Sequence, residues 1–142
     1  MIDKILICTM GLPRSGKSTW AQNYGRKQGY PIVSPDAIRL ELYGKSFWIP
    51  GEKMVWAIAD LMVRSLFTAG HSVVILDATN FSKTQRSKWY SPDWITVFKE
   101  IDTDYLECMR RAQKEGREDL YRIIRHMYLN YEPLEIGEDY LK

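Results

Sequence analysis

The chain has 142 residues, of which 45% are hydrophobic, and this length is typical of a single domain with its own core, so we expect one domain over 1–142. Its net charge is +2, from 20 basic and 18 acidic residues, so no strong overall field attracts nucleic acid or a membrane, and any anion site must be local. Two unpatterned cysteines argue against a disulfide framework, and no apolar run suits a signal peptide or a membrane span, so we expect a cytoplasmic protein without a membrane partner.

Hydrophobic patterning predicts that strands and helices alternate along the chain. Short apolar runs predict strands at 4–10, 31–34, 71–76 and 94–101. Apolar residues that recur every three or four positions, bounded by Gly, Pro and Ser, predict helices at 17–28, 34–44, 50–69, 82–90, 105–113 and 120–130. Because this alternation places helices on both faces of a parallel sheet, we expect a three-layer α/β/α fold with a central, mainly parallel sheet of four or five strands.

The first predicted strand leads into a Gly-x-x-x-x-Gly-Lys-Ser motif, and a helix-compatible segment follows. This order is typical of a phosphate-binding P-loop rather than of a chance match in a turn. The glycines let the backbone curl its N–H groups around a phosphate, and the helix start adds a positive dipole end. Lys17 is a mobile charge for the outer phosphates, and the Ser18 hydroxyl is an expected Mg²⁺ ligand, whereas the side chain of Arg14 is expected to point outward. The donor nucleotide, ATP or another nucleoside triphosphate, is therefore predicted to be bound by Gly11, Arg14, Ser15, Gly16, Lys17, Ser18 and Thr19.

Charged side chains follow the second predicted strand, at the edge where a parallel sheet places its ligands. Asp36 can take the proton from an attacking hydroxyl, and Arg39, on the same face of the helix turn, can hold a phosphate of the acceptor. Alternatively, Asp36 caps a helix start, and Arg39 is solvated or pairs with Glu41. The neighbouring P-loop favours the catalytic interpretation.

Asp77 ends the third predicted strand in the manner of the Mg²⁺-associated acid of P-loop enzymes, which usually acts through a bound water. The alternative is an ordinary loop aspartate in a local turn with Thr79 and Asn80.

An arginine cluster surrounds Gly116, and we predict a short helical lid at about 110–119. Arginines in such a lid neutralise charge on the migrating phosphoryl group, and we expect at least one member of Arg110, Arg111 and Arg117 to do so. The alternative is an exposed helix face paired with Glu107, Glu115 and Glu118. Arg86 is expected either in the acceptor groove or in solvent.

Aromatic residues flank the same edge of the predicted sheet. Phe47-Trp48 and Phe81 either stack on a base, as aromatic platforms do in single-strand binding proteins, or cover the rim of the core. Trp56 and Trp94 are predicted to lie in the core.

Over nearly its whole length the sequence resembles the 5′-polynucleotide kinase-type P-loop kinases. The resemblance is carried by GLPRSGKSTW at 11–20, PDAIR at 35–39, DATN at 77–80 with Arg86, and the arginines at 110–117. It implies that Lys17 and Ser18 bind the phosphates of ATP and Mg²⁺, that Asp36 activates a 5′-hydroxyl, and that Arg39 grips the adjacent phosphate of the acceptor. It leaves the catalytic lid arginine as either Arg111 or Arg117.

The predicted function is an ATP- and Mg²⁺-dependent kinase that moves the γ-phosphate to a 5′-hydroxyl of DNA or RNA. Its predicted catalytic residues are Lys17, Asp36, Arg111 and Arg117, its acceptor-binding residues Asp36, Arg39 and Arg86, and its metal ligands Ser18 and Asp77. The first alternative keeps the chemistry but uses a nucleoside, a nucleotide or another metabolite hydroxyl as the acceptor. The second is an NTP-hydrolysing regulatory protein, for which the sequence holds no second signature. Oligomeric state and the choice between ATP and GTP stay open.

Overall fold

A four-stranded, fully parallel sheet forms the centre of the computed structural model, which describes residues 3–135 and 137–141. Its strands, in the order β2-β3-β1-β4 across the sheet, are β1 (Ile5–Met10), β2 (Ile32–Val33), β3 (Val73–Leu76) and β4 (Ile95–Glu100). The apolar run of β1 lies in the middle because both of its edges are paired and both of its faces are covered. The parallel sheet that the alternating pattern predicts is confirmed.

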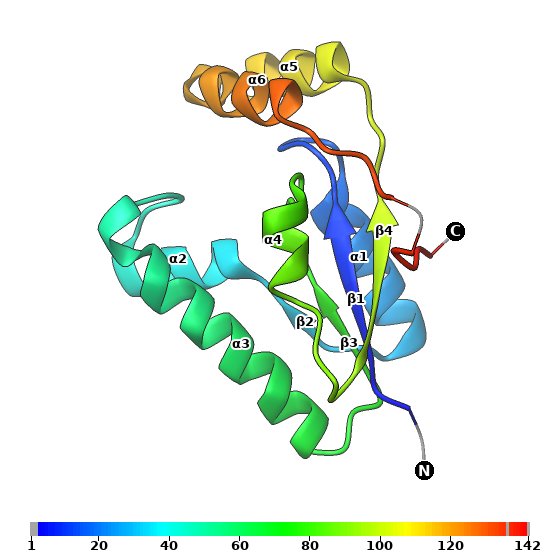
Figure 1. The fold of residues 1–142 in the computed structure, drawn as a ribbon. Helices are drawn as coiled ribbons and strands as arrows, with labels where there is room; N and C mark the ends of the chain where they lie inside the picture. The colour runs from blue at the N-terminus through cyan, green and yellow to red at the C-terminus, as the bar shows by residue number, and fades with distance from the viewer. Residues whose placement is uncertain (1–2, 136, 142) are drawn as a thin grey trace.

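Helices cover both faces of this sheet (Figure 1), so the predicted three-layer α/β/α architecture is confirmed. One face packs on α1 (Lys17–Gln28), through Ile7 and Ile75 of the sheet against Ala21. The alternate residues of the same strands, Leu6 and Val74 among them, point to the other face. That face is covered by α2 (Pro35–Tyr43), α3 (Glu52–Thr68) and α4 (Lys83–Ser87), and the short helix η1 (Ile49–Gly51) leads into α3.

A helical hairpin lies beyond the carboxyl ends of the strands (Figure 1). It consists of α5 (Tyr105–Lys114), η2 (Glu118–Leu120) and α6 (Tyr121–Leu129). Its own apolar cluster joins Cys108, Ala112 and Ile124 to Leu12. The lid expected at 110–119 is therefore only the middle of a larger unit, because α6 must bury its apolar stripe against α5.

Several boundaries differ from expectation; β3, for example, begins at Val73 rather than at 71. β2 pairs over two residues rather than over 31–34, and α4 ends at Ser87 rather than near 90. Beside β4, the C-terminal segment adds one parallel bridge, between Phe98 and Tyr140. Over the described residues the sheet has four strands, the lower of the two expected numbers. Trp94 is buried as predicted, whereas Trp56 is only half-buried.

Across the described part of the chain, every helix is too short or too polar to span a bilayer.

Candidate active site

The P-loop connects β1 to α1 in a tight curl. Gly11 N–H donates to Thr79 O at 2.9 Å, and Ser15 N–H donates to Leu12 O at 3.1 Å. Gly16 is the N-cap of α1, with a φ of 102° that a side chain would disfavour. At Gly11 a Cβ atom would lie 2.6 Å from Ile101 O, so only glycine fits there. The two glycines of the motif are therefore required by the backbone path itself.

The polar groups of this loop suit an anion. The Ser15 hydroxyl is buried and has no hydrogen-bond partner among residues 3–135 and 137–141, which is an unfavourable state unless a ligand supplies one. Because Gly16 has no side chain, nothing caps the first-turn N–H groups of α1. A phosphate at this helix start satisfies both sets of groups and gains from the helix dipole. The loop thus fits the nucleotide that the sequence predicts.

Lys17 is folded over the loop rather than extended into solvent. Its ammonium donates to Leu12 O at 2.7 Å, and the side chain is only 8% exposed. Burial lowers the pKa of Lys17 to about 8, although the charges of Asp77 and Asp36 oppose this shift. Both carboxylates act on Lys17, so the structure brings the ends of β2 and β3 to the P-loop.

Ser18 and Asp77 meet beside Lys17. The Ser18 hydroxyl donates to Asp77 Oδ2 at 2.6 Å, and Thr9 Oγ1 lies 3.4 Å from Asp77 Oδ1. Asp77 therefore faces the P-loop rather than making a local turn with Thr79. A hydroxyl and a carboxylate are hard oxygen ligands, and Mg²⁺ commonly takes one or two protein ligands beside substrate phosphates. These two residues thus fit the metal role that the sequence assigns to them.

Asn80, directly after this loop, fixes the end of β1. Its Nδ2 donates to Thr9 O at 2.9 Å, and its φ is 46°, a left-handed conformation that asparagine tolerates. The Asp77–Asn80 segment is thereby tied to the strand that carries the P-loop.

Asp36 does not cap α2. Ser34 is the N-cap, and its side chain accepts from Ala37 N–H at 3.1 Å. The Asp36 carboxylate is 75% exposed and accepts from Arg39 Nη1 at 2.7 Å. It is thus open to an acceptor hydroxyl while an arginine orients it.

Arg39 is held by a residue that sequence reasoning missed. Its Nε and Nη2 donate to the two carboxylate oxygens of Glu52 at 2.8 and 2.7 Å, so Glu41 is not its partner. The guanidinium carbon also lies 5.5 Å from the ring centroid of Trp56. Burial lowers the pKa of Arg39, but hydrogen bonds and charge from Glu52 outweigh it and raise the pKa. Glu52 begins α3 behind Pro50 and Gly51, which is the one signal that could have drawn attention to it.

The helical hairpin is fastened to the P-loop by Arg111, by Glu115 and by Thr103, which directly precedes the hairpin. Arg111 Nη1 donates to Arg14 O at 3.1 Å and would lie 3.8 Å from a Cβ atom at Gly16, and Thr103 Oγ1 donates to Ser15 O at 2.6 Å. The Arg14 side chain turns toward the hairpin and pairs with Glu115 at 3.0 Å, rather than pointing outward as expected.

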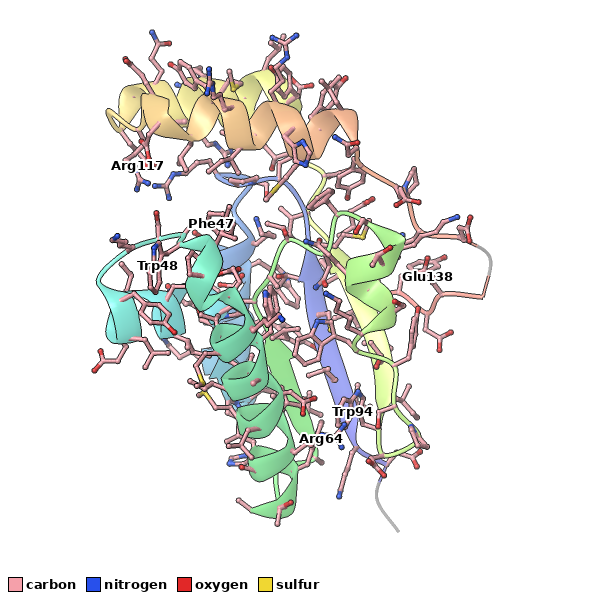
Figure 2. The ribbon with its side chains drawn as sticks, turned by 60° about the vertical axis from the view of Figure 1, so that its left-hand side comes forward. Phe47, Trp48, Arg64, Trp94, Arg117 and Glu138 are labelled. Carbon is pink, nitrogen blue, oxygen red and sulfur yellow. The ribbon has the colours of Figure 1, made fainter. Side chains whose placement is uncertain are left out.

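The remaining arginines of the cluster lie differently. Arg110 pairs with Glu107 at 2.6 Å on the exposed side of α5, and its hydrogen bonds lower the pKa of Glu107 to about 2. Arg117 pairs with Asp119 at 3.0 Å, and Figure 2 shows it pointing from the hairpin toward the loop of Phe47 and Trp48. Arg111 is therefore the cluster member that contacts the P-loop, and Arg117 lies toward the loop of Phe47 and Trp48.

Arg86 does not belong to this site, and its expected place in an acceptor groove or in solvent is wrong. Its side chain is fully buried, and it bonds Glu138 Oε2 at 2.9 Å, Asn80 O at 3.0 Å and Pro133 O at 3.2 Å. Its two other donors point to Glu138 Oε1 at 3.3 Å and to Met10 Sδ at 4.0 Å, so all five N–H groups have partners within the described residues and none is left for an acceptor. Arg86 instead ties α4 and the loop after β3 to the C-terminal segment.

A cavity of about 330 Å³ adjoins the P-loop at Gly11 and Leu12. Its lining also includes aromatic and acidic residues, among them Tyr128, Tyr131 and Asp102. Carboxylates repel phosphate, so this cavity does not compete with the P-loop for the phosphate chain.

Fold and site together define a P-loop kinase, a class that binds ATP or another nucleoside triphosphate. Residues 6–120 match the AAA domain family, and because they make up most of the chain, the chain belongs to that family. A chain of the Pnkp1/Rnl/Hen1 complex is 28% identical over 78% of this chain, with a TM-score of 0.71. The present chain spans only 40% of the length of that relative.

Small-molecule kinases share the fold. A gluconokinase from Sinorhizobium meliloti is 17% identical, with a TM-score of 0.65, and the match covers 98% of this chain and 81% of that one. The APS kinase CysC of Mycobacterium tuberculosis, bound to AMPPNP and APS, is 18% identical, with a TM-score of 0.68 and coverage of 99% and 89%. At these identities the likeness shows the fold alone, so the acceptor must be argued from the site.

Proposed function

We propose that this chain is an ATP- and Mg²⁺-dependent kinase that phosphorylates the 5′-hydroxyl of a polynucleotide. The observation that carries the proposal is the Asp36–Arg39–Glu52 arrangement beside the P-loop. Glu52 holds Arg39 in a fixed direction, and a fixed guanidinium matches the geometry of a phosphate. An acceptor that carries a phosphate next to its hydroxyl uses both Asp36 and Arg39, and the 28% identity to a chain of the Pnkp1/Rnl/Hen1 complex supports a polynucleotide.

The chemistry follows from the placement of these groups. Asp36 takes the proton of the 5′-hydroxyl as its oxygen bonds to the γ-phosphorus, and the bond from that phosphorus to the β-phosphate oxygen breaks, releasing ADP. Lys17 and Arg111 lie against the P-loop and neutralise charge on the transferred group. Ser18 and Asp77 would hold Mg²⁺, which supplies further charge neutralisation on the phosphate oxygens when bound. Holding donor and acceptor in line is the main contribution of the protein.

The alternative acceptor is a small phosphorylated metabolite, since it uses Asp36 and Arg39 in the same way. The gluconokinase and the APS kinase support this alternative only through the shared fold. A water acceptor does not need the Arg39–Glu52 pair, so the arrangement counts against an NTP-hydrolysing regulatory protein.

The test is transfer of label from γ-labelled ATP with Mg²⁺. The acceptors, assayed in parallel, are a 5′-OH oligonucleotide, a nucleoside 3′-monophosphate, a free nucleoside, gluconate and water. We expect label on the oligonucleotide and a rate lowered about 10²- to 10⁴-fold by Asp36→Asn, the range for loss of a general base. The matched control is Glu41→Gln, which changes an exposed carboxylate on the same helix and should leave the rate unchanged.

Label on the small acceptors alone would show that the enzyme phosphorylates metabolites rather than polynucleotides. Phosphate release without any acceptor, unchanged in Asp36→Asn, would contradict the kinase assignment.

A further inference from the structure

Two large aromatic side chains lie exposed beside the acceptor end of this site. Phe47 is 53% and Trp48 40% exposed, on the segment between α2 and η1. The Phe47 ring centroid lies 5.9 Å from the guanidinium carbon of Arg39. Figure 2 shows both rings on the loop that faces the hairpin. The aromatic surface therefore begins where the proposed acceptor phosphate is held.

Packing holds the Trp48 side of this surface in place. Trp48 packs edge-on against Tyr43, with ring centroids 4.9 Å apart and planes at 62°. Both rings close over Gly51, where a Cβ atom would collide with the Tyr43 ring and would lie 2.9 Å from Trp48 Cε3. A rigid ring loses little entropy when a ligand stacks on it, so its exposure costs less at a binding site than elsewhere.

Positive charge flanks the rings. The Lys45 ammonium lies 5.4 Å from the Trp48 ring centroid, and Arg117 points toward this loop from the hairpin (Figure 2). Lys45 is exposed, so it can leave the ring for a phosphate when a base covers the aromatic face. Aromatic faces combined with mobile cations are the means by which proteins bind single-stranded nucleic acid without strong sequence preference.

We propose that Phe47 and Trp48 form a stacking platform for a base at the 5′ end of a single-stranded acceptor. This proposal rests on the proposed function and deepens it, because it names the feature that selects nucleic acid over acceptors without a base. The Arg39 site holds the backbone phosphate, and the platform holds a base next to that phosphate. An apolar protein partner is the other occupant that such rings could take, and the experiment below distinguishes the two.

The experiment compares kcat/KM for a 5′-OH oligonucleotide with that for the same strand lacking its first two bases. The abasic strand leaves the protein untouched, so its effect does not depend on how a variant folds. For the unaltered protein we expect kcat/KM to fall about 5- to 150-fold, mainly through KM, the range for loss of base–aromatic stacking. The variant Phe47→Leu/Trp48→Leu should lower kcat/KM on the normal strand by a similar factor and should no longer distinguish the two strands.

Three controls accompany this comparison. Trp48→Phe keeps an aromatic face and should retain most of the discrimination. Ile49→Ala, the next and 75% exposed residue, should behave as the unaltered protein does. ATP affinity, measured on every variant, should not change, because the platform does not touch the P-loop.

The outcomes separate the two proposals. Efficient phosphorylation of normal and abasic strands alike would overturn the platform and leave the polynucleotide kinase standing, and the rings would then suit a protein partner. An equal loss on both strands in the leucine variant, with no base effect in the unaltered protein, would assign the rings a structural role and also overturn the platform. Transfer only to acceptors without a base would overturn both proposals.

Discussion

The burial of the Lys17 ammonium beside the P-loop is unfavourable in the absence of a bound phosphate chain. Its ammonium is nearly buried, and one carbonyl and two nearby carboxylates do not fully replace its lost hydration, so its pKa falls to about 8. In the folded chain this value lies below the ordinary 10.5, which means that the fold disfavours the charged form. The destabilisation is complete below pH 8, shrinks as the pH rises toward 10.5, and is absent above it.

Lys17→Met should therefore stabilise the nucleotide-free protein while abolishing ATP binding. We expect a gain of about 1 to 3 kcal/mol at pH 7, with the upper bound set by the pKa difference and reduced by the lost hydrogen bond to Leu12. Urea unfolding at pH 7 and pH 10 measures the gain, which should shrink at the higher pH. Lys27→Met, an exposed change on the same helix, should stay within about 0.5 kcal/mol of the unaltered protein. A less stable Lys17→Met at pH 7 would contradict this account.

At the scale of elements, the acceptor side depends on how α2 sits against α3. Arg39 of α2 and Glu52 of α3 form a bidentate pair, and Trp56 of α3 lies against the same guanidinium. The pair is only partly exposed, at 12% and 20% of the two side chains, so solvent screens it weakly. The packing of α2 against α3 and the direction of the Arg39 side chain therefore depend on the same contacts.

Glu52→Gln should weaken the grip on a phosphate-bearing acceptor. One of the two hydrogen bonds and the charge are lost, so Arg39 becomes free to turn, and KM for the 5′-OH oligonucleotide should rise about tenfold. ATP affinity should not change, because the hydrogen bonds of Glu52 described above go to Arg39 and not to the P-loop. Steady-state kinetics with the oligonucleotide and with a free nucleoside measure the difference, and the free nucleoside should be affected little. An equal effect on both acceptors would show that Glu52 supports the fold rather than the phosphate site.

The sequence predicts most of these elements and only part of their contacts. The P-loop can be predicted from the sequence because the residues that form it are neighbours along the chain. The glycines, Lys17 and Ser18 lie within a few positions of one another, and the backbone path between them is tightly constrained. Parallel strands bring Asp36 and Asp77 to one edge, which the alternating pattern also predicts. The Arg39–Glu52 pair joins residues on two helices across an irregular loop, and no periodicity encodes how that loop folds. The inward turn of Arg14 depends likewise on where the hairpin places Glu115.

At the scale of the whole molecule, the C-terminal segment packs against the rest of the fold and pairs with the buried guanidinium of Arg86. It pairs with β4 through Phe98, and Glu138 supplies the counter-charge to Arg86. Arg86 in turn binds Asn80 O, while Asn80 holds Thr9 at the end of β1. No local pattern reveals this role, since the sequence separation between Arg86 and Glu138 is 52 residues and an arginine after a capped helix start usually lies in solvent.

Arg86→Met should consequently destabilise the molecule as a whole. It keeps much of the side-chain volume but removes the counter-charge of Glu138, which retains only its bonds from Tyr90 and the Glu135 backbone, and it removes the donor to the carbonyl oxygens of Asn80 and Pro133. We therefore expect a loss of about 3 to 5 kcal/mol or failure to fold. Lys83→Met is the matched control, because Lys83 pairs with Glu135 at an exposed position and should leave the stability nearly unchanged.

The double variant Arg86→Met/Glu138→Gln separates the cost of leaving the Glu138 charge unpaired from the rest of the stability loss in Arg86→Met. Removing the unpaired carboxylate together with the guanidinium should recover part of the lost stability, since an uncompensated charge is the largest part of the penalty. Urea unfolding of the two single variants and the double variant measures the coupling between the two residues. A double variant whose loss equals the sum of the single losses would contradict this account, because two residues joined only by a weak contact behave additively.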